Sequence, residues 1–153
     1  MKIGVELRLD RDAGELFADA RALEAAGVDS FWASGQDEIV LLAAIAALTF
    51  RARIAAANDD APALRTLELL ARGRLIRASP RGDERTVPAG DGQSERWRRV
   101  AFPTGRAAWK ELRAKAEAEG IDGLILENDP RLLDLVRNPD VEDDRSDIKL
   151  AFG

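Results

Sequence analysis

Residues 1–34 read MKIGVELRLDRDAGELFADARALEAAGVDSFWAS, and this stretch decides the expected fold. Apolar and polar residues alternate over residues 2–9, which is typical of a β-strand. A helix should follow, because Asp10 or Asp12 can cap its start and Gly27 can end it. Residues 28–34 then form a second strand. Two strands joined by a helix make the βαβ unit of a parallel sheet.

The same unit repeats as far as Ser79. Asp37 can cap a helix that leads to a short strand over residues 53–57. Pro62 suits the first turn of a third helix, which Gly73 ends before a fourth strand. A complete eight-stranded (β/α) barrel needs at least about 200 residues, and this chain has 153. We therefore expect a barrel of this type that is truncated and does not close.

The pattern changes after residue 80. Glycine, proline, aspartate and arginine are frequent up to residue 93, and a turn at residues 89–92 predicts a β-hairpin between residues 85–87 and 97–102. A helix that Thr104 can cap and Gly120 can end, a strand over residues 121–126 and a short helix stopped by Asn138-Pro139 should follow.

The expected fold class is therefore α/β, a truncated (β/α) TIM-like barrel with about five parallel strands and a β-hairpin insertion. We treat residues 1–153 as a single domain. Its expected parts are the βα repeats (1–79), the hairpin insertion (80–103) and a C-terminal helix–strand–helix with its tail (104–153).

Composition excludes several kinds of chemistry. The chain contains no histidine, cysteine or tyrosine, so Ser-His and Cys-His catalysis, disulfides and thiolate metal sites are excluded. A net charge of −5 argues against non-specific binding to nucleic acid. We found no apolar stretch of membrane-spanning length and no signal-peptide pattern. We expect a cytoplasmic protein with neither a nucleic-acid nor a membrane partner.

In parallel α/β barrels, ligands bind over the carboxyl ends of the strands. The residues expected there as cofactor contacts are Glu6, Arg8, Ser34, Gln36, Asp37, Asn58, Arg77 and Ser79, with Glu127 and Asn128 after the last strand. No catalytic residue is assigned among them.

Several of these residues also have structural explanations. Asp37 sits where a helix cap would, and Glu6 and Arg8 share one strand face and could form an internal ion pair. Trp97, beside three arginines at 96, 98 and 99, could stack on a ring of a ligand or pack across the hairpin or an interface. Asp59-Asp60 is better explained as a solvated loop, so we expect no metal site.

Some of these motifs resemble the N-terminal half of the bacterial-luciferase-like monooxygenases. The matching stretches are Gly27 to Trp32, the segment 42–49 before Arg53-Ile54, Thr66-Leu67, and Gly73-Arg74-Leu75. Where that family usually carries an Asp-His pair, this chain has Gly35-Gln36-Asp37-Glu38, so the acidic residue has a counterpart and the imidazole does not.

The resemblance implies a flavin- or deazaflavin-linked oxidoreductase of monooxygenase type, with FMN or a deazaflavin held at the strand ends, in which activity is retained, reduced or lost. The alternative is a non-catalytic dimerisation or docking module derived from that family. An open half-barrel would expose strand edges and an apolar inner face. We therefore expect a homodimer, or a complex with a full-length barrel relative.

Overall fold

The computed structural model describes residues 1–8, 12–35, 37–57, 61–89 and 92–139. Its first half follows the expected repeat. The elements are β1 (Lys2–Leu7), α1 (Ala13–Ala25), β2 (Ser30–Ala33), α2 (Glu38–Leu48), β3 (Arg53–Ala56), α3 (Ala61–Ala71) and β4 (Leu75–Arg77). The second half contains β5 (Ser79–Arg81), β6 (Glu84–Pro88), β7 (Ser94–Arg99), α4 (Arg106–Ala118), β8 (Gly123–Glu127) and α5 (Leu132–Arg137).

The helix ends show why these segments stop where they do. The carboxylate of Asp12 accepts the backbone N–H of Glu15 at 3.1 Å and caps α1. Gly27 and Gly73 end α1 and α3 with φ angles of 99° and 79°, a region that favours glycine. Asp37 occupies the N-cap position of α2, but its side chain makes no capping hydrogen bond. Gly105, not Thr104, is the N-cap residue of α4.

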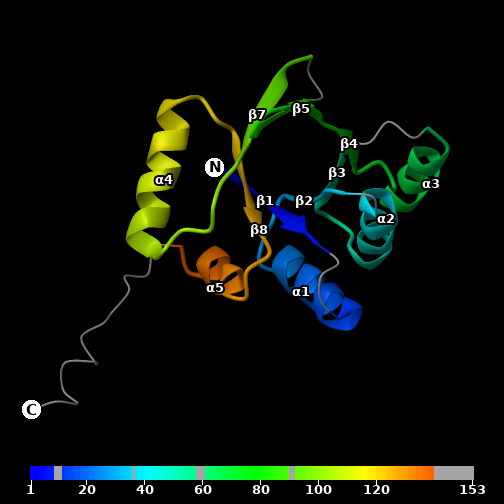
Figure 1. The fold of residues 1–153 in the computed structure, drawn as a ribbon, viewed down its shortest axis with the longest axis horizontal. Coiled ribbons are helices and arrows are strands. Elements are labelled where there is room, and N and C mark those ends of the chain that lie inside the picture. Colours follow the sequence, from blue (N-terminus) through cyan, green and yellow to red (C-terminus); the bar gives the residue numbers. More distant parts are fainter. Residues whose placement is uncertain (9–11, 36, 58–60, 90–91, 140–153) are drawn as a thin grey trace, which may run out of the picture.

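The strands of the described residues belong to one sheet with the order β4-β3-β2-β1-β8-β7-β6-β5. Six neighbouring strands of this sheet are parallel, namely β4, β3, β2, β1, β8 and β7. Strand β6 is antiparallel to both β5 and β7. The two ends of the sheet are continuous in the chain, because only Ala78 separates β4 from β5. The backbone N–H of Ala78 donates to Ala56 O at 2.9 Å. This bent strand pairs first with β3 and then with β6, so the sheet forms a nearly closed barrel (Figure 1).

The expected half-barrel with open strand edges is therefore wrong, and the count of about five parallel strands is not confirmed. Strand β7 pairs in parallel with β8, so β7, α4 and β8 form a further βαβ unit. Sequence analysis treated β7 only as an arm of a hairpin. The hairpin is present as β6 and β7, but it forms part of the barrel wall instead of being an insertion.

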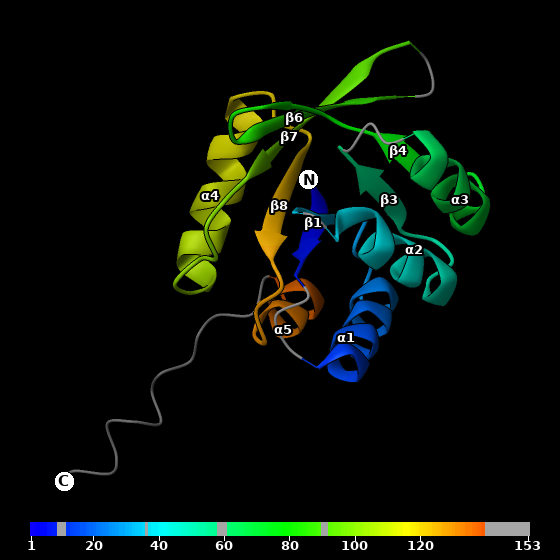
Figure 2. The ribbon, with the colours of Figure 1, turned by 45° about the vertical axis from the view of Figure 1, so that its right-hand side comes forward.

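The helices lie outside the barrel, while the side formed by β5 and β6 has no helix over it in the described part of the chain (Figures 1 and 2). The core between sheet and helices is aliphatic and includes Leu7, Phe31 and Leu124. A second core fills the inside of the barrel and consists of Trp32, Ala55, Ala78, Val87, Trp97 and Ile125.

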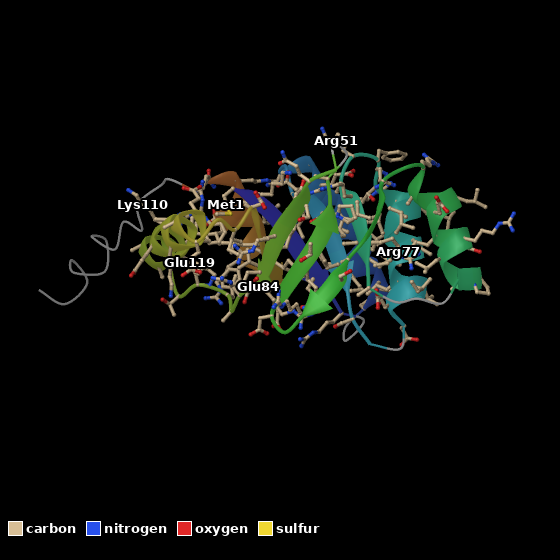
Figure 3. The ribbon with its side chains drawn as sticks, turned by 90° about the horizontal axis from the view of Figure 1, so that it is seen from above. Met1, Arg51, Arg77, Glu84, Lys110 and Glu119 are labelled. Carbon is tan, nitrogen blue, oxygen red and sulfur yellow. The ribbon has the colours of Figure 1, made fainter. Side chains whose placement is uncertain are left out.

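Charged pairs cover the outer face of β6 and β7 in place of a helix. Glu84 accepts hydrogen bonds from Arg98 at 2.9 Å and from Arg96 at 3.2 Å, and Arg98 also pairs with Glu119. The hydrogen bonds from Arg98 and Arg96 lower the pKa of Glu84. Glu84 and Glu119 lie near α4, whereas Arg77 lies on the side of α2 and α3 (Figure 3). No helix in the described part of the chain is both long and apolar enough to cross a bilayer.

Two glycines make room for the two tryptophans inside the barrel. A Cβ atom on Gly4 would lie 2.5 Å from Trp32 Nε1, and one on Gly123 would lie 2.4 Å from Trp97 Cε3. Both distances are shorter than a van der Waals contact. The barrel therefore accepts these large rings only because the facing positions on β1 and β8 have no side chain.

We predict that Gly123→Ala lowers the free energy of unfolding by roughly 1–3 kcal/mol, since the added methyl group overpacks the interior against Trp97. Urea unfolding measures this change. In a Trp97→Leu background the same substitution should cost at least about 1 kcal/mol less, because the clashing ring atoms are gone. An equal cost in both backgrounds would contradict the glycine–tryptophan contact.

Candidate functional site

Inward-facing side chains divide the barrel interior into an amino-terminal floor, a middle and a carboxyl-terminal mouth. Trp32 and Trp97 fill the middle, with ring centroids 5.6 Å apart and planes inclined at 51°. Trp97 is fully buried and Trp32 is 5% exposed. Of the two structural roles expected for Trp97, packing across strands is the one observed.

The floor is an ion cluster centred on Glu95 of β7. Its Oε1 accepts hydrogen bonds from Lys2 at 2.5 Å and Arg53 at 3.2 Å. Its Oε2 accepts from Arg53 and from Trp97 Nε1, both at 2.9 Å. The Arg53 guanidinium also lies 5.4 Å from the centroid of the Trp97 ring. Both oxygens of this carboxylate are therefore fully engaged.

Burial of Glu95 opposes its ionisation, but the hydrogen bonds from Arg53, Lys2 and Trp97 outweigh that effect. They lower the pKa of Glu95 from 4.5 to about 2. The floor is consequently an ionised, self-contained cluster at neutral pH.

The mouth is built around Glu6, near the carboxyl end of β1. Glu6 is 1% exposed. Its Oε1 accepts a hydrogen bond from Ser34 Oγ at 2.8 Å and one from Nη2 of Arg99, which ends β7. Because β7 runs parallel to β1 and β2, all three residues lie at the same end of the barrel.

The Glu6–Arg99 pair is incomplete. Within the part of the chain that the structure describes, Glu6 Oε2 and Arg99 Nε are buried without a hydrogen-bond partner. An unsatisfied buried polar group costs roughly 1–3 kcal/mol. The floor contains no such group on Glu95, so the two ends of the barrel differ in how completely their charges are paired.

Arg8 and Glu127 lie farther out and form an exposed ion pair, with Arg8 Nη2 2.8 Å from Glu127 Oε1. Of the two alternatives for Glu6 and Arg8, a shared place at the mouth and an internal ion pair, the ion pair is not seen, since Glu6 pairs with Arg99 and Arg8 with Glu127. Arg8 still belongs to the mouth, because it follows Glu6 on the inward-facing side of β1.

The structure joins Glu6 to Ser34 and Arg8 to Glu127, so it brings four of the predicted contact residues to the mouth. Asp37 is exposed at the start of α2. Gln36 and Asn58 lie outside the described residues. Arg77 and Ser79 are exposed and do not join this cluster, because Ala78 between them takes the inward position of the bent strand.

Arg99 is the mouth residue that sequence analysis missed. It was grouped with Arg96 and Arg98 as a basic patch. The strand alternation of β7 separates them, since Arg96 and Arg98 face outward and Arg99 faces inward with Trp97 and Glu95. That alternation was present in the sequence, but the parallel pairing of β7 was not recognised.

A depression of about 440 Å³ lies at the opposite, amino-terminal end and is lined by residues 24–29 and 51–53. Glu24 is the buried acid there, and its carboxylate accepts backbone N–H groups of Phe50, Arg51 and Ala52 at 2.7–3.1 Å. Burial of Glu24 opposes ionisation, but these hydrogen bonds outweigh it and lower its pKa. We attribute this carboxylate to loop structure and not to ligand binding.

Searches against protein-family models, curated proteins and solved structures return no significant match to this chain. The resemblance to the luciferase-like family therefore stays a prediction.

The floor cluster gives stability a defined pH dependence. Ionised Glu95 stabilises the fold above its ordinary pKa of 4.5, and this contribution is lost as the pH falls toward about 2. We predict that Glu95→Gln lowers the free energy of unfolding by roughly 1–3 kcal/mol at neutral pH, and that the difference from wild type shrinks below about pH 4.5.

Urea unfolding at a series of pH values measures this dependence. The exposed Glu111 on α4 supplies the control, since Glu111→Gln should change stability by less than about 0.5 kcal/mol. A Glu95→Gln effect that stays constant down to low pH would contradict the role of the ionised carboxylate.

Proposed function

We propose that this chain binds a flavin or deazaflavin cofactor over the carboxyl-terminal mouth and acts as an oxidoreductase of the luciferase-like type. The observation that carries the proposal is the buried Glu6–Arg99 pair, with a free acceptor and a free donor, at the end of the barrel where such folds bind ligands. The choice of cofactor class rests on the sequence resemblance.

The residues at the mouth fit such a cofactor in their chemistry. A flavin ring system offers both hydrogen-bond donors and acceptors along its polar edge, and the mouth offers Glu6 Oε2 as acceptor and Arg99 Nε as donor. The tryptophans below fill the middle of the barrel, so the ligand would lie across the mouth and not descend into the barrel.

A bound cofactor of this class supplies the hydride or electron transfer, which the side chains of this protein do not provide. Arg99 and Arg8 would place positive charge beside the ring and favour its reduced, more negative form. Ser34 would hold Glu6 in place through its hydrogen bond to Oε1. The chain contains no histidine or tyrosine, and Glu6 supplies a buried carboxylate at the mouth.

Ser34 offers a way to block the mouth without disturbing the core, because it is exposed. We predict that Ser34→Trp weakens binding of FMN or a deazaflavin at least about tenfold, since the ring covers Glu6. Quenching of cofactor fluorescence measures the affinity. Ser79→Trp is the matched control, because Ser79 is also exposed but does not join the mouth cluster. Unchanged binding by Ser34→Trp, or no binding by the wild type, would refute the proposal.

A second candidate function is a homodimeric docking module. Helix α2 is apolar on all sides, and residues 39–50 contain no charge. Val40 is 72% exposed, and Leu69 on the neighbouring α3 is 75% exposed. A helix that is apolar all round is normally buried against a partner. The open strand edges that first suggested a second copy are not observed. The exposed apolar side chains of α2 and α3 now give the reason to expect one.

We predict a dimer at about 10 μM that Val40→Lys converts to monomer, because burying a lysine in an apolar contact is costly. Sedimentation equilibrium distinguishes the two states. Thr66→Lys, at an exposed polar position on α3, should leave the dimer intact. A monomeric wild type would remove this candidate and leave the cofactor proposal in place.

A further inference from the structure

The contact between Glu6 and Arg99 is one-sided. Arginine–carboxylate pairs commonly form two parallel hydrogen bonds. Here Nη2 of Arg99 and Oγ of Ser34 both bind Oε1 of Glu6, whereas Oε2 of Glu6 and Nε of Arg99 are buried without a hydrogen-bond partner among the described residues.

Each of these two free atoms is one carbon away from an atom of the Glu6–Arg99 contact. Oε2 is joined to Oε1 through one carbon, and Nε is joined to Nη2 through one carbon. Because Oε1 and Nη2 are in contact, the free acceptor and the free donor lie on adjoining groups. The ion pair therefore contains one acceptor and one donor that a ligand could satisfy.

We propose that this pair recognises a planar imide or cis-amide edge. The ring N–H of the ligand would donate to Glu6 Oε2, and the adjacent carbonyl oxygen would accept from Arg99 Nε. Recognition of such an edge does not depend on the proposed function. Only the identification of the ligand as a flavin or deazaflavin rests on it, since both classes share such a pyrimidinedione edge.

Charge argues against other small ligands at this position. An anion would be repelled by Glu6, and a cation would be repelled by Arg99. A neutral group that carries a donor beside an acceptor satisfies both free atoms. The nearby interior side chains, Trp32 and Ile125, are apolar, and hydrogen bonds are stronger in such low-dielectric surroundings.

Arg99 is the part of the pair that must move to admit a ligand. Its side chain is 34% exposed, whereas that of Glu6 is 0% exposed. Glu6 therefore acts as the fixed half of the recognition pair, and Arg99 as the half that closes over the ligand edge.

The test uses two probes that differ at one nitrogen. 1-Methyluracil retains the N3–H group, and 1,3-dimethyluracil replaces its hydrogen with a methyl group. Titration of the full chain, followed by NMR shifts of the Ser34 and Arg99 backbone amides, should show at least about tenfold tighter binding of 1-methyluracil. Equal binding of the two probes, or binding of neither, would overturn the inference.

Variants assign the preference to Glu6. In Glu6→Gln the preference for 1-methyluracil should fall to within about twofold, because the amide is uncharged and presents an NH₂ donor at one of its two positions. Glu84→Gln is the matched control, since Glu84 on β6 accepts from Arg98 on the outer face of the barrel, away from the mouth. If Glu6→Gln does not fold, Arg99→Lys serves instead, because it keeps the charge and loses Nε. A preference that survives the substitution would overturn the inference.

Flavin binding separates this inference from the proposed function. If 1-methyluracil binds as expected and FMN and deazaflavin do not, edge recognition stands and the cofactor proposal fails. If riboflavin and N3-methylriboflavin bind equally well, the cofactor proposal stands and edge recognition fails.

Discussion

The fold depends on the bend at Ala78. This residue joins β4, which pairs with β3, to β5, which pairs with β6, and so connects the two ends of the sheet. Its small side chain faces into the barrel, and its N–H group bonds to Ala56. Because the strand changes partner within one residue, the chain needs fewer residues than a regular barrel, in which every parallel strand requires its own crossover helix.

Closure also determines what the interior contains. A barrel with few strands has little space inside, and here glycines at positions 4 and 123 face the two tryptophans. The two charged clusters lie at the two ends, where Lys2, Arg53 and Glu95 form the floor and Glu6 and Arg99 form the mouth. The aromatic middle keeps these two clusters apart.

Sequence analysis predicted β1 to β4 and the ends of α1 and α3 because their signals are local. Asp12, Gly27 and Gly73 each act on the helix beside them. The role of β7 was missed because its parallel pairing with β8 is a long-range contact, which residues 94–99 do not reveal by themselves. The same error hid Arg99, whereas Glu6, Arg8 and Ser34 were found because the strands that carry them were correctly placed.

The two ends of the barrel hold the same kinds of residue, yet they differ in a way that bears on function. Glu95 has donors on both oxygens, and its surroundings hold it ionised. Glu6 is less exposed than Glu95 but has donors on one oxygen only. Burial without full pairing destabilises a carboxylate. A contribution to fold stability therefore does not explain why a glutamate is buried at position 6. A ligand that completes its hydrogen bonding would recover that energy on binding, and this is why we place the site at the mouth.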